Sequence, residues 1–285
     1  MPGRRSSLRD VTPTHDTAAW SSQYGVTDTE RAANRRVAFL VPLAPLGFIV
    51  AFGAIAAGGL AAAGAVGLGI VILIGSAVLG GVIVVAGLLA APVHVERLLG
   101  AHRVPEGSAP RVENLVEGLC ATFGVAHPPL FVVEDDRVNL AMVATSTGAV
   151  MVVTSGLLEG LDLIELEGVV AHGLAHLRLD DVRRGTLAAT IPAFLGNDSI
   201  RHRLAGRGRL LRADEVAAVS VRYPVAIAAV LERCAAQPDP EPPSLFASDR
   251  FARTRWLWFD PLTRGDDAIG EVDATSVRAQ ALAEW

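Results

Sequence analysis

The sequence predicts an α+β protein in which an N-terminal transmembrane helical hairpin precedes a mainly helical domain with a small β-sheet. Apolar residues make up 51% of the 285 residues and charged residues 19%, whereas a typical soluble domain has about 25% charged residues. No charged side chain lies between Val37 and Val93. Beyond that run, two short strand-like runs follow one another and precede longer stretches with helical spacing, which is typical of an α+β domain.

The uncharged run from Val37 to Val93 is long enough for two crossings, because one helical crossing of a bilayer takes about 20 apolar residues. A turn is predicted near Gly58–Gly64, where glycine and alanine gather. A signal peptide does not explain the run, since its apolar core has only about 7–15 residues. Small residues four apart in the second crossing would let the two helices approach closely. These are Ser76 with Gly80 and Ala77 with Gly81.

The arginines predict the orientation, because they flank the two crossings and are absent from the connecting turn. They are Arg31, Arg35 and Arg36 before the crossings and Arg97 and Arg103 after them. We therefore expect a multi-pass protein of the cell membrane with both termini cytoplasmic: a tail (1–36), a transmembrane hairpin (37–93) and a cytoplasmic domain (95–285). The lipid bilayer is one predicted partner. Nucleic acid is not, because a net charge of −5 provides no basic face.

The first part of the cytoplasmic domain contains one predicted helix and two predicted strands. Apolar residues recur at helical spacing within Pro110–Phe123, and the proline suits the first turn of a helix. Leu130–Val133 is a short apolar run, and Ala149–Thr154 is a second run rich in β-branched residues. Both are predicted to be strands.

The second part of the domain is predicted to be helical. Asp162 suits a helix N-cap with Glu165 at capping-box spacing, and that helix should run to about Leu179. A further helix is predicted over residues 210–235. The four prolines within 237–243 then predict a loop before a short C-terminal helix.

Two histidines lie on one face of the predicted helix that Asp162 begins. His172 and His176 are four residues apart, which places their side chains about 6 Å apart and suits two imidazoles that share one metal ion. By itself this spacing is a weak signal, because it arises often by chance.

The residues around the two histidines make the signal stronger. The stretch Glu165–Arg178, ELEGVVAHGLAHLR, resembles the active-site helix of the HtpX-like and CAAX-prenyl-protease family of membrane zinc metallopeptidases, which are gluzincin-type HExxH enzymes. Val138–Ala141, Val152–Leu158 and Arg209–Asp214 resemble further segments of that family in the same order. The resemblance covers roughly residues 95–235 and implies a zincin-like domain behind paired membrane helices.

Two positions depart from the family pattern. The residue after the first histidine should be the glutamate that activates the metal-bound water, and here it is Gly173. The resemblance places the third metal ligand, a glutamate, at Leu210, whose side chain binds no metal. It also implies that Asp214 supports a metal-bound histidine. Asp214, or Glu215 beside it, is a candidate substitute ligand. We therefore expect zinc binding at His172 and His176 to be weak or absent.

Three functions are compatible with this pattern. The favoured one is a catalytically inactive pseudo-protease that acts by binding a peptide or a membrane-protein partner. Its peptide would pair with the backbone of Ala149–Thr154, expected to be an edge strand, at Val152, Val153 and Thr154. The second is an active zinc-dependent membrane endopeptidase with substituted ligands. The third is a purely structural membrane subunit.

Overall fold

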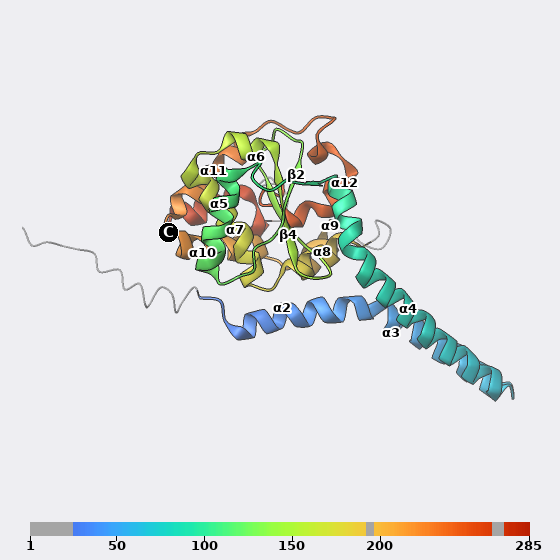
Figure 1. Ribbon diagram of the computed structural model, residues 1–285. Helices are drawn as coiled ribbons and strands as arrows, with labels where there is room; N and C mark the ends of the chain where they lie inside the picture. Colours follow the sequence, from blue (N-terminus) through green and yellow to red (C-terminus); the bar gives the residue numbers. More distant parts are fainter. Residues whose placement is uncertain (1–24, 192–196, 264–270) are drawn as a thin grey trace, which may run out of the picture.

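The computed structural model describes residues 25–191, 197–263 and 271–285, and shows the predicted α+β architecture with two long N-terminal apolar helices (Figure 1). Most of the predicted tail (1–36) lies outside the described residues. The α-helices are α2 (Asp28–Leu40), α3 (Ala44–Ala62), α4 (Val66–Leu99), α5 (Pro110–Phe123), α6 (Ser155–Gly160), α7 (Leu163–Arg178), α8 (Val182–Ala189), α9 (Asp198–Ala205), α10 (Arg209–Val221), α11 (Pro224–Ala236), α12 (Asp249–Thr254) and α13 (Thr275–Ala283). The strands are β1 (His102–Arg103), β2 (Leu130–Val133), β3 (Leu140–Ala144) and β4 (Ala149–Thr154). Short 3₁₀ helices are η1 (Val41–Leu43), η2 (Leu245–Ala247), η3 (Arg255–Leu257) and η4 (Glu271–Asp273).

Helices α3 and α4 form a hairpin that projects from the domain (Figure 1). The turn lies at the end of the predicted range, where Gly64 adopts a φ of 84° that favours glycine. Close approach at Ser76 and Gly80 is confirmed: a Cβ on Gly53 would overlap the Ser76 side chain, and one on Gly80 would lie 2.7 Å from Leu46 Cδ1. The second predicted pair, Ala77 with Gly81, is wrong, because a Cβ on Gly81 would meet nothing within 4 Å in the described structure.

The apolar stretches of this hairpin are long enough to cross a membrane. They are Asp28–Ala62, which includes α2, and Val66–Gly87, and only 11% and 17% of their most apolar windows are buried. A helix in the core of a soluble protein would be mostly buried instead. The exposed large apolar side chains of α3 and α4, among them Phe48, Phe52 and Ile74, therefore suit a lipid surrounding.

The two outer ends of the hairpin are fixed to the domain. At the C-terminal end of α4, Val95 and Leu99 are buried in the core. On the other side, α2 lies along the domain (Figure 1), and its Asn34 Nδ2 donates to the carbonyl of Leu179. The predicted boundary of the tail at residue 36 thus falls inside a docked helix, since α2 begins at Asp28.

The sheet has the strand order β1-β2-β4-β3, with β4 parallel to β2 and antiparallel to β3. The prediction that Ala149–Thr154 is an edge strand is wrong. Val152, Val153 and Thr154 pair with β2 through Phe131, Val132 and Val133, and Val152 and Val153 also pair with Ala141 and Leu140 of β3. Their side chains are fully buried, so these residues have no free backbone edge for a peptide.

The alternating side chains of the sheet divide the core into two layers. Leu140, Met142 and Met151 face the layer that contains α5, α7, α10 and α11. Ala141, Val143 and Val152 face the opposite layer, which contains the end of α4 together with α12 and the chain around Trp258. Helix α7 is therefore the central helix of the domain, between the sheet and α10 and α11.

The predicted helices are largely confirmed, with one correction. The capping box of Asp162 and Glu165 is present at the start of α7. The single helix predicted over 210–235 is wrong, because the chain breaks it into α10 and α11. Arg222 adopts a φ of 58°, and Pro224 begins the second helix, a position where its missing N–H costs nothing.

Candidate functional site

The two histidines of α7 meet in the interior of the domain. Both side chains are 1% exposed, and His172 Nε2 lies 3.3 Å from His176 Nε2. Two nitrogens bound to one tetrahedral zinc at 2.0–2.1 Å would lie about 3.3–3.4 Å apart. The pair thus has the geometry of one half of such a site, as the spacing in the sequence predicted.

The second ring nitrogen of each histidine, Nδ1, contacts a buried carboxylate, which fixes the orientation of the ring. His172 Nδ1 lies 2.7 Å from Asp214 Oδ1, which is the supporting contact that the family resemblance implied. His176 Nδ1 lies 3.0 Å from both oxygens of Asp181. The role of Asp181 was missed at the sequence level. The available signal was its position three residues after the end of α7, where the chain turns back toward the histidine.

Each of these carboxylates also meets a buried arginine. Arg278 binds Asp214 through two contacts, Nε to Oδ2 at 2.6 Å and Nη2 to Oδ1 at 2.9 Å. Arg209 Nε lies 3.1 Å from Asp181 Oδ2. Despite burial, the net effect is a pKa below the usual range for both aspartates, since the arginine and histidine beside each one favour its charged form.

The histidines themselves are neutral. Burial lowers the pKa of His172 to about 3, and it lowers the pKa of His176 as well, because the charged imidazolium is poorly solvated in the interior. The cluster of His172, His176, Asp181, Asp214 and the two arginines is therefore electrically balanced. Two carboxylates face two guanidinium groups, so neither carboxylate of the cluster is left without a positive partner.

Position 173 faces the sheet, where a side chain would crowd the ends of two buried core residues. A Cβ on Gly173 would lie 2.7 Å from Leu140 Cδ2 and 3.4 Å from Met151 Cε. Leu140 is 1% exposed and Met151 is 0% exposed, so both are packed in the core. The packing of these two side chains thus suits a residue without a side chain at position 173.

The structure provides no third metal ligand for the pair. Leu210 is 1% exposed and apolar, and no group of three or more His, Cys, Asp or Glu side chains within residues 25–191, 197–263 and 271–285 could hold a metal ion. Asp214 lies on the Nδ1 side of His172, away from the nitrogen that faces His176. Glu215 forms an ion pair with Arg212 at 2.9 Å. The donor set does not fit a catalytic zinc, which takes three protein ligands and a water.

The C-terminal part of the chain covers the cluster. The ring of Phe259 lies edge-on to His172, with centroids 4.9 Å apart, and Arg278 lies over the same ring. The Phe259 amide donates to the Leu140 carbonyl at 2.7 Å, and Trp258 forms a bridge with Ala141. The outer edge of β3, where an extended peptide would pair, is therefore occupied by the protein itself at these positions.

Comparison with known proteins identifies the domain that surrounds this cluster. A family model described as Peptidase family M48 matches residues 106–232, a range that includes α7, α10 and the sheet strands β2 to β4. The chain contains an HtpX-like M48 peptidase domain. The resemblance seen around His172 and His176 is thus confirmed.

Curated relatives of the same kind match parts of this chain. A protease HtpX homolog of Dictyoglomus thermophilum is 41% identical over 91 residues, which cover 30% of this chain and 29% of the relative. Homologs from Aquifex aeolicus and Tropheryma whipplei are each 37% identical, over 35% and 34% of this chain and 33% and 34% of their own lengths. The chain spans about a third of the length of the curated relatives it matches. No solved structure matches.

Proposed function

We propose that this protein is a membrane-anchored M48 homologue without proteolytic activity, which acts by binding. One observation carries the proposal: Gly173 stands at the position of the general base, and Leu140 and Met151 pack against it so closely that even a Cβ there would lie 2.7 Å from Leu140 Cδ2. A positioned general base contributes roughly 10²–10⁴-fold to such a reaction. Restoring it here would require the side chains of Leu140 and Met151 to shift, in addition to the change at the glycine.

The charge balance of the cluster supports the same proposal. M48 peptidases are zinc enzymes, so zinc is the metal to consider at His172 and His176. Two nitrogen ligands and an apolar Leu210 make a weak donor set, and Arg278 and Arg209 already neutralise the supporting carboxylates. The alternative of an active enzyme with substituted ligands loses support, because Asp214 and Glu215 are engaged elsewhere.

The first experiment combines elemental analysis with a casein-degradation assay on the purified full-length chain. We expect substoichiometric zinc and no degradation. Zinc and activity should appear only in a variant that combines Gly173→Glu and Leu210→Glu with Leu140→Ala, which makes room for the new glutamate. Near-stoichiometric zinc in the unaltered chain that disappears in His172→Ala, together with degradation abolished by a chelator, would overturn the proposal.

We further propose that α3 and α4 both cross the membrane and that both termini are cytoplasmic, which the arginines at Arg31, Arg35 and Arg97 support. The chain suits a cysteine-labelling test, because its two native cysteines are buried. Ala63→Cys in the turn should react with a membrane-impermeant maleimide on intact cells, whereas Ser108→Cys in the domain should react only after lysis. Labelling of Ser108→Cys from outside would contradict the orientation.

A further inference from the structure

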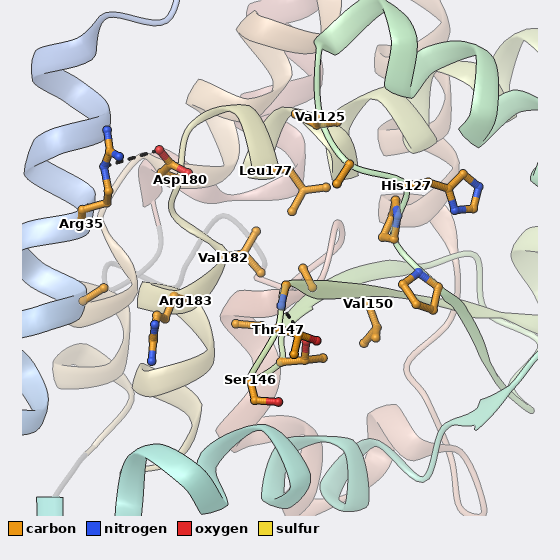
Figure 2. A pocket seen from close by; sticks show the side chains of 18 of the residues that line it. Arg35, Val125, His127, Ser146, Thr147, Val150, Leu177, Asp180, Val182 and Arg183 are labelled. Carbon is orange, nitrogen blue, oxygen red and sulfur yellow. Dashed lines mark hydrogen bonds and ion pairs between the residues drawn. The ribbon is translucent and has the colours of Figure 1, made fainter. Parts of the chain in front are cut away.

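A large cavity, lined by none of the residues of the histidine cluster, lies between the juxtamembrane helix and the peptidase-like domain. Its volume is about 1360 Å³, above the roughly 300–1,000 Å³ of ordinary small-molecule sites. Helix α2 and η1 form one wall, and the domain forms the others. Figure 2 shows Arg35, Asp180 and Arg183 on one side of the cavity and His127 on the opposite side, with Ser146 on the turn between β3 and β4.

The lining of the cavity is strongly positive. It includes four arginines and one aspartate, a net formal charge of +3, in a chain whose net charge is −5. Arg31 and Arg35 share that single aspartate, Asp180, at 3.1 and 3.6 Å. Arg103 and Arg183 are exposed, and within the described part of the chain neither has an ion-pair partner. Two positive charges are thus available to an anionic ligand.

Part of the remaining lining is apolar and continuous with the membrane hairpin, and the rest includes His127 and polar residues of the β3–β4 turn, Thr145, Ser146 and Thr147. Phe39, Pro42 and Leu43 lie on the α2–η1 wall, and α3 begins at the next residue, Ala44. Phe39 is 69% exposed. A ligand in this cavity would therefore meet arginines at one part of its surface and apolar side chains next to the first crossing at another.

We propose that this cavity binds one anionic phospholipid, whose headgroup is attracted by the uncompensated charge of Arg103 and Arg183 and whose acyl chains lie beside Phe39, Pro42 and Leu43. Three features select this occupant: the uncompensated positive charge, the apolar wall, and the position of that wall at the start of the first apolar crossing. Arginine is well suited to phosphate, because its guanidinium group donates in parallel to two oxygens. The site is separate from His172 and His176, so the proposal stands whether or not the domain is proteolytic.

The test counts lipids on the full-length chain in neutral detergent by native mass spectrometry, after addition of phosphatidylglycerol or phosphatidylcholine. The cavity variant Arg103→Gln/Arg183→Gln is compared with Arg36→Gln/Arg111→Gln, in which two exposed arginines outside the cavity are changed. Both variants lose the same charge. Thermal unfolding confirms that each is folded, as expected for exposed positions.

We expect one tightly held phosphatidylglycerol per unaltered chain and no comparable phosphatidylcholine. The cavity variant should bind phosphatidylglycerol about 30-fold more weakly, from about fivefold for each arginine lost near an anionic headgroup, and the control should bind it unchanged. Equal losses in both variants, no loss in the cavity variant, or equal retention of phosphatidylcholine would each overturn the proposal. Displacement by millimolar inorganic phosphate alone, or by an acidic peptide, would show a different anionic ligand and overturn the choice of a lipid.

Discussion

The histidine cluster and the cavity beneath α2 differ in their balance of positive and negative charge. In the cluster, each buried carboxylate has a histidine and an arginine beside it, and the sum of charges is balanced. In the cavity, four arginines face one aspartate. A balanced interior needs no ligand, because burial makes every uncompensated charge costly. An open, unbalanced surface leaves charge for a ligand to neutralise. The membrane side of the domain is therefore better suited to an anionic ligand than the histidine cluster.

The strongest test of this difference between the two regions is a substitution that removes one charge from the cluster. Arg278→Met should destabilise the protein by about 3–5 kcal/mol, because it leaves the Asp214 carboxylate buried with one arginine fewer. Denaturant unfolding in detergent, followed through the fluorescence of the buried Trp256 and Trp258, measures the change. The matched cavity variant Arg183→Met should change the stability by less than about 0.5 kcal/mol. Similar effects of the two substitutions would contradict the distinction.

Lowering the pH should also destabilise the cluster, and the loss of stability per pH unit should be smaller than the effect of Arg278→Met. Unfolded histidines take up a proton near pH 6.5, whereas folded His172 stays neutral down to about pH 3. Between these values the unfolded chain binds more protons, so the folded state loses stability as the pH falls, by up to about 1.4 kcal/mol per pH unit for each such histidine. The lowered pKa of His176 acts in the same direction.

The pH effect is measured by unfolding at pH 7, 6 and 5. His172→Asn, whose amide keeps a donor toward Asp214, should reduce the slope. His127→Asn in the exposed wall of the cavity serves as the control and should leave it unchanged. A stability that is flat between pH 7 and pH 5 would mean that the cluster is not held in the neutral form.

Which of these features the sequence could predict depends on how local they are. The histidine pair and the capping box of α7 lie within one helix, and spacing alone predicted both. The Asp181–Arg209 and Asp214–Arg278 pairs join residues that are 28 and 64 positions apart; no periodicity links them. The glycine at position 173 was visible in the sequence, but its packing against Leu140 was not, because that packing depends on how β3 lies against α7.

The wrong prediction that β4 is an edge strand could have been avoided, because the residues of the strand itself indicate a central position. Ala149–Thr154 has no alternation of apolar and polar residues, and a strand of uninterrupted apolar residues is typical of a sheet centre covered on both faces. The family resemblance favoured an edge, and composition indicated the centre. The break between α10 and α11 was equally local, since Pro224 stands where a helix interior would need an N–H.

A third prediction concerns the tight contact at Gly173. Gly173→Ala should destabilise the protein by about 1 kcal/mol, since overpacking costs about 1–3 kcal/mol and the better helix propensity of alanine returns about 1. Gly118→Ala on α5 is the matched control, because a Cβ there meets nothing within 4 Å, and it should stabilise by up to about 1 kcal/mol. Unfolding curves that show stabilisation in both variants would mean that the space beside position 173 is open after all.

The smallest expected effect on stability comes from Asp180, which lies at the cavity and is next in sequence to the cluster carboxylate Asp181. Asp180→Asn keeps a residue type that tolerates the φ of 55° and removes the partner of Arg31 and Arg35. These are partly exposed ion pairs, so the stability should fall by no more than about 1 kcal/mol. The cavity, however, loses the one acidic side chain among the described residues that line it, and the retention of phosphatidylglycerol should rise. If retention falls instead, Asp180 holds α2 in the position that forms the cavity wall, and its structural role outweighs its charge.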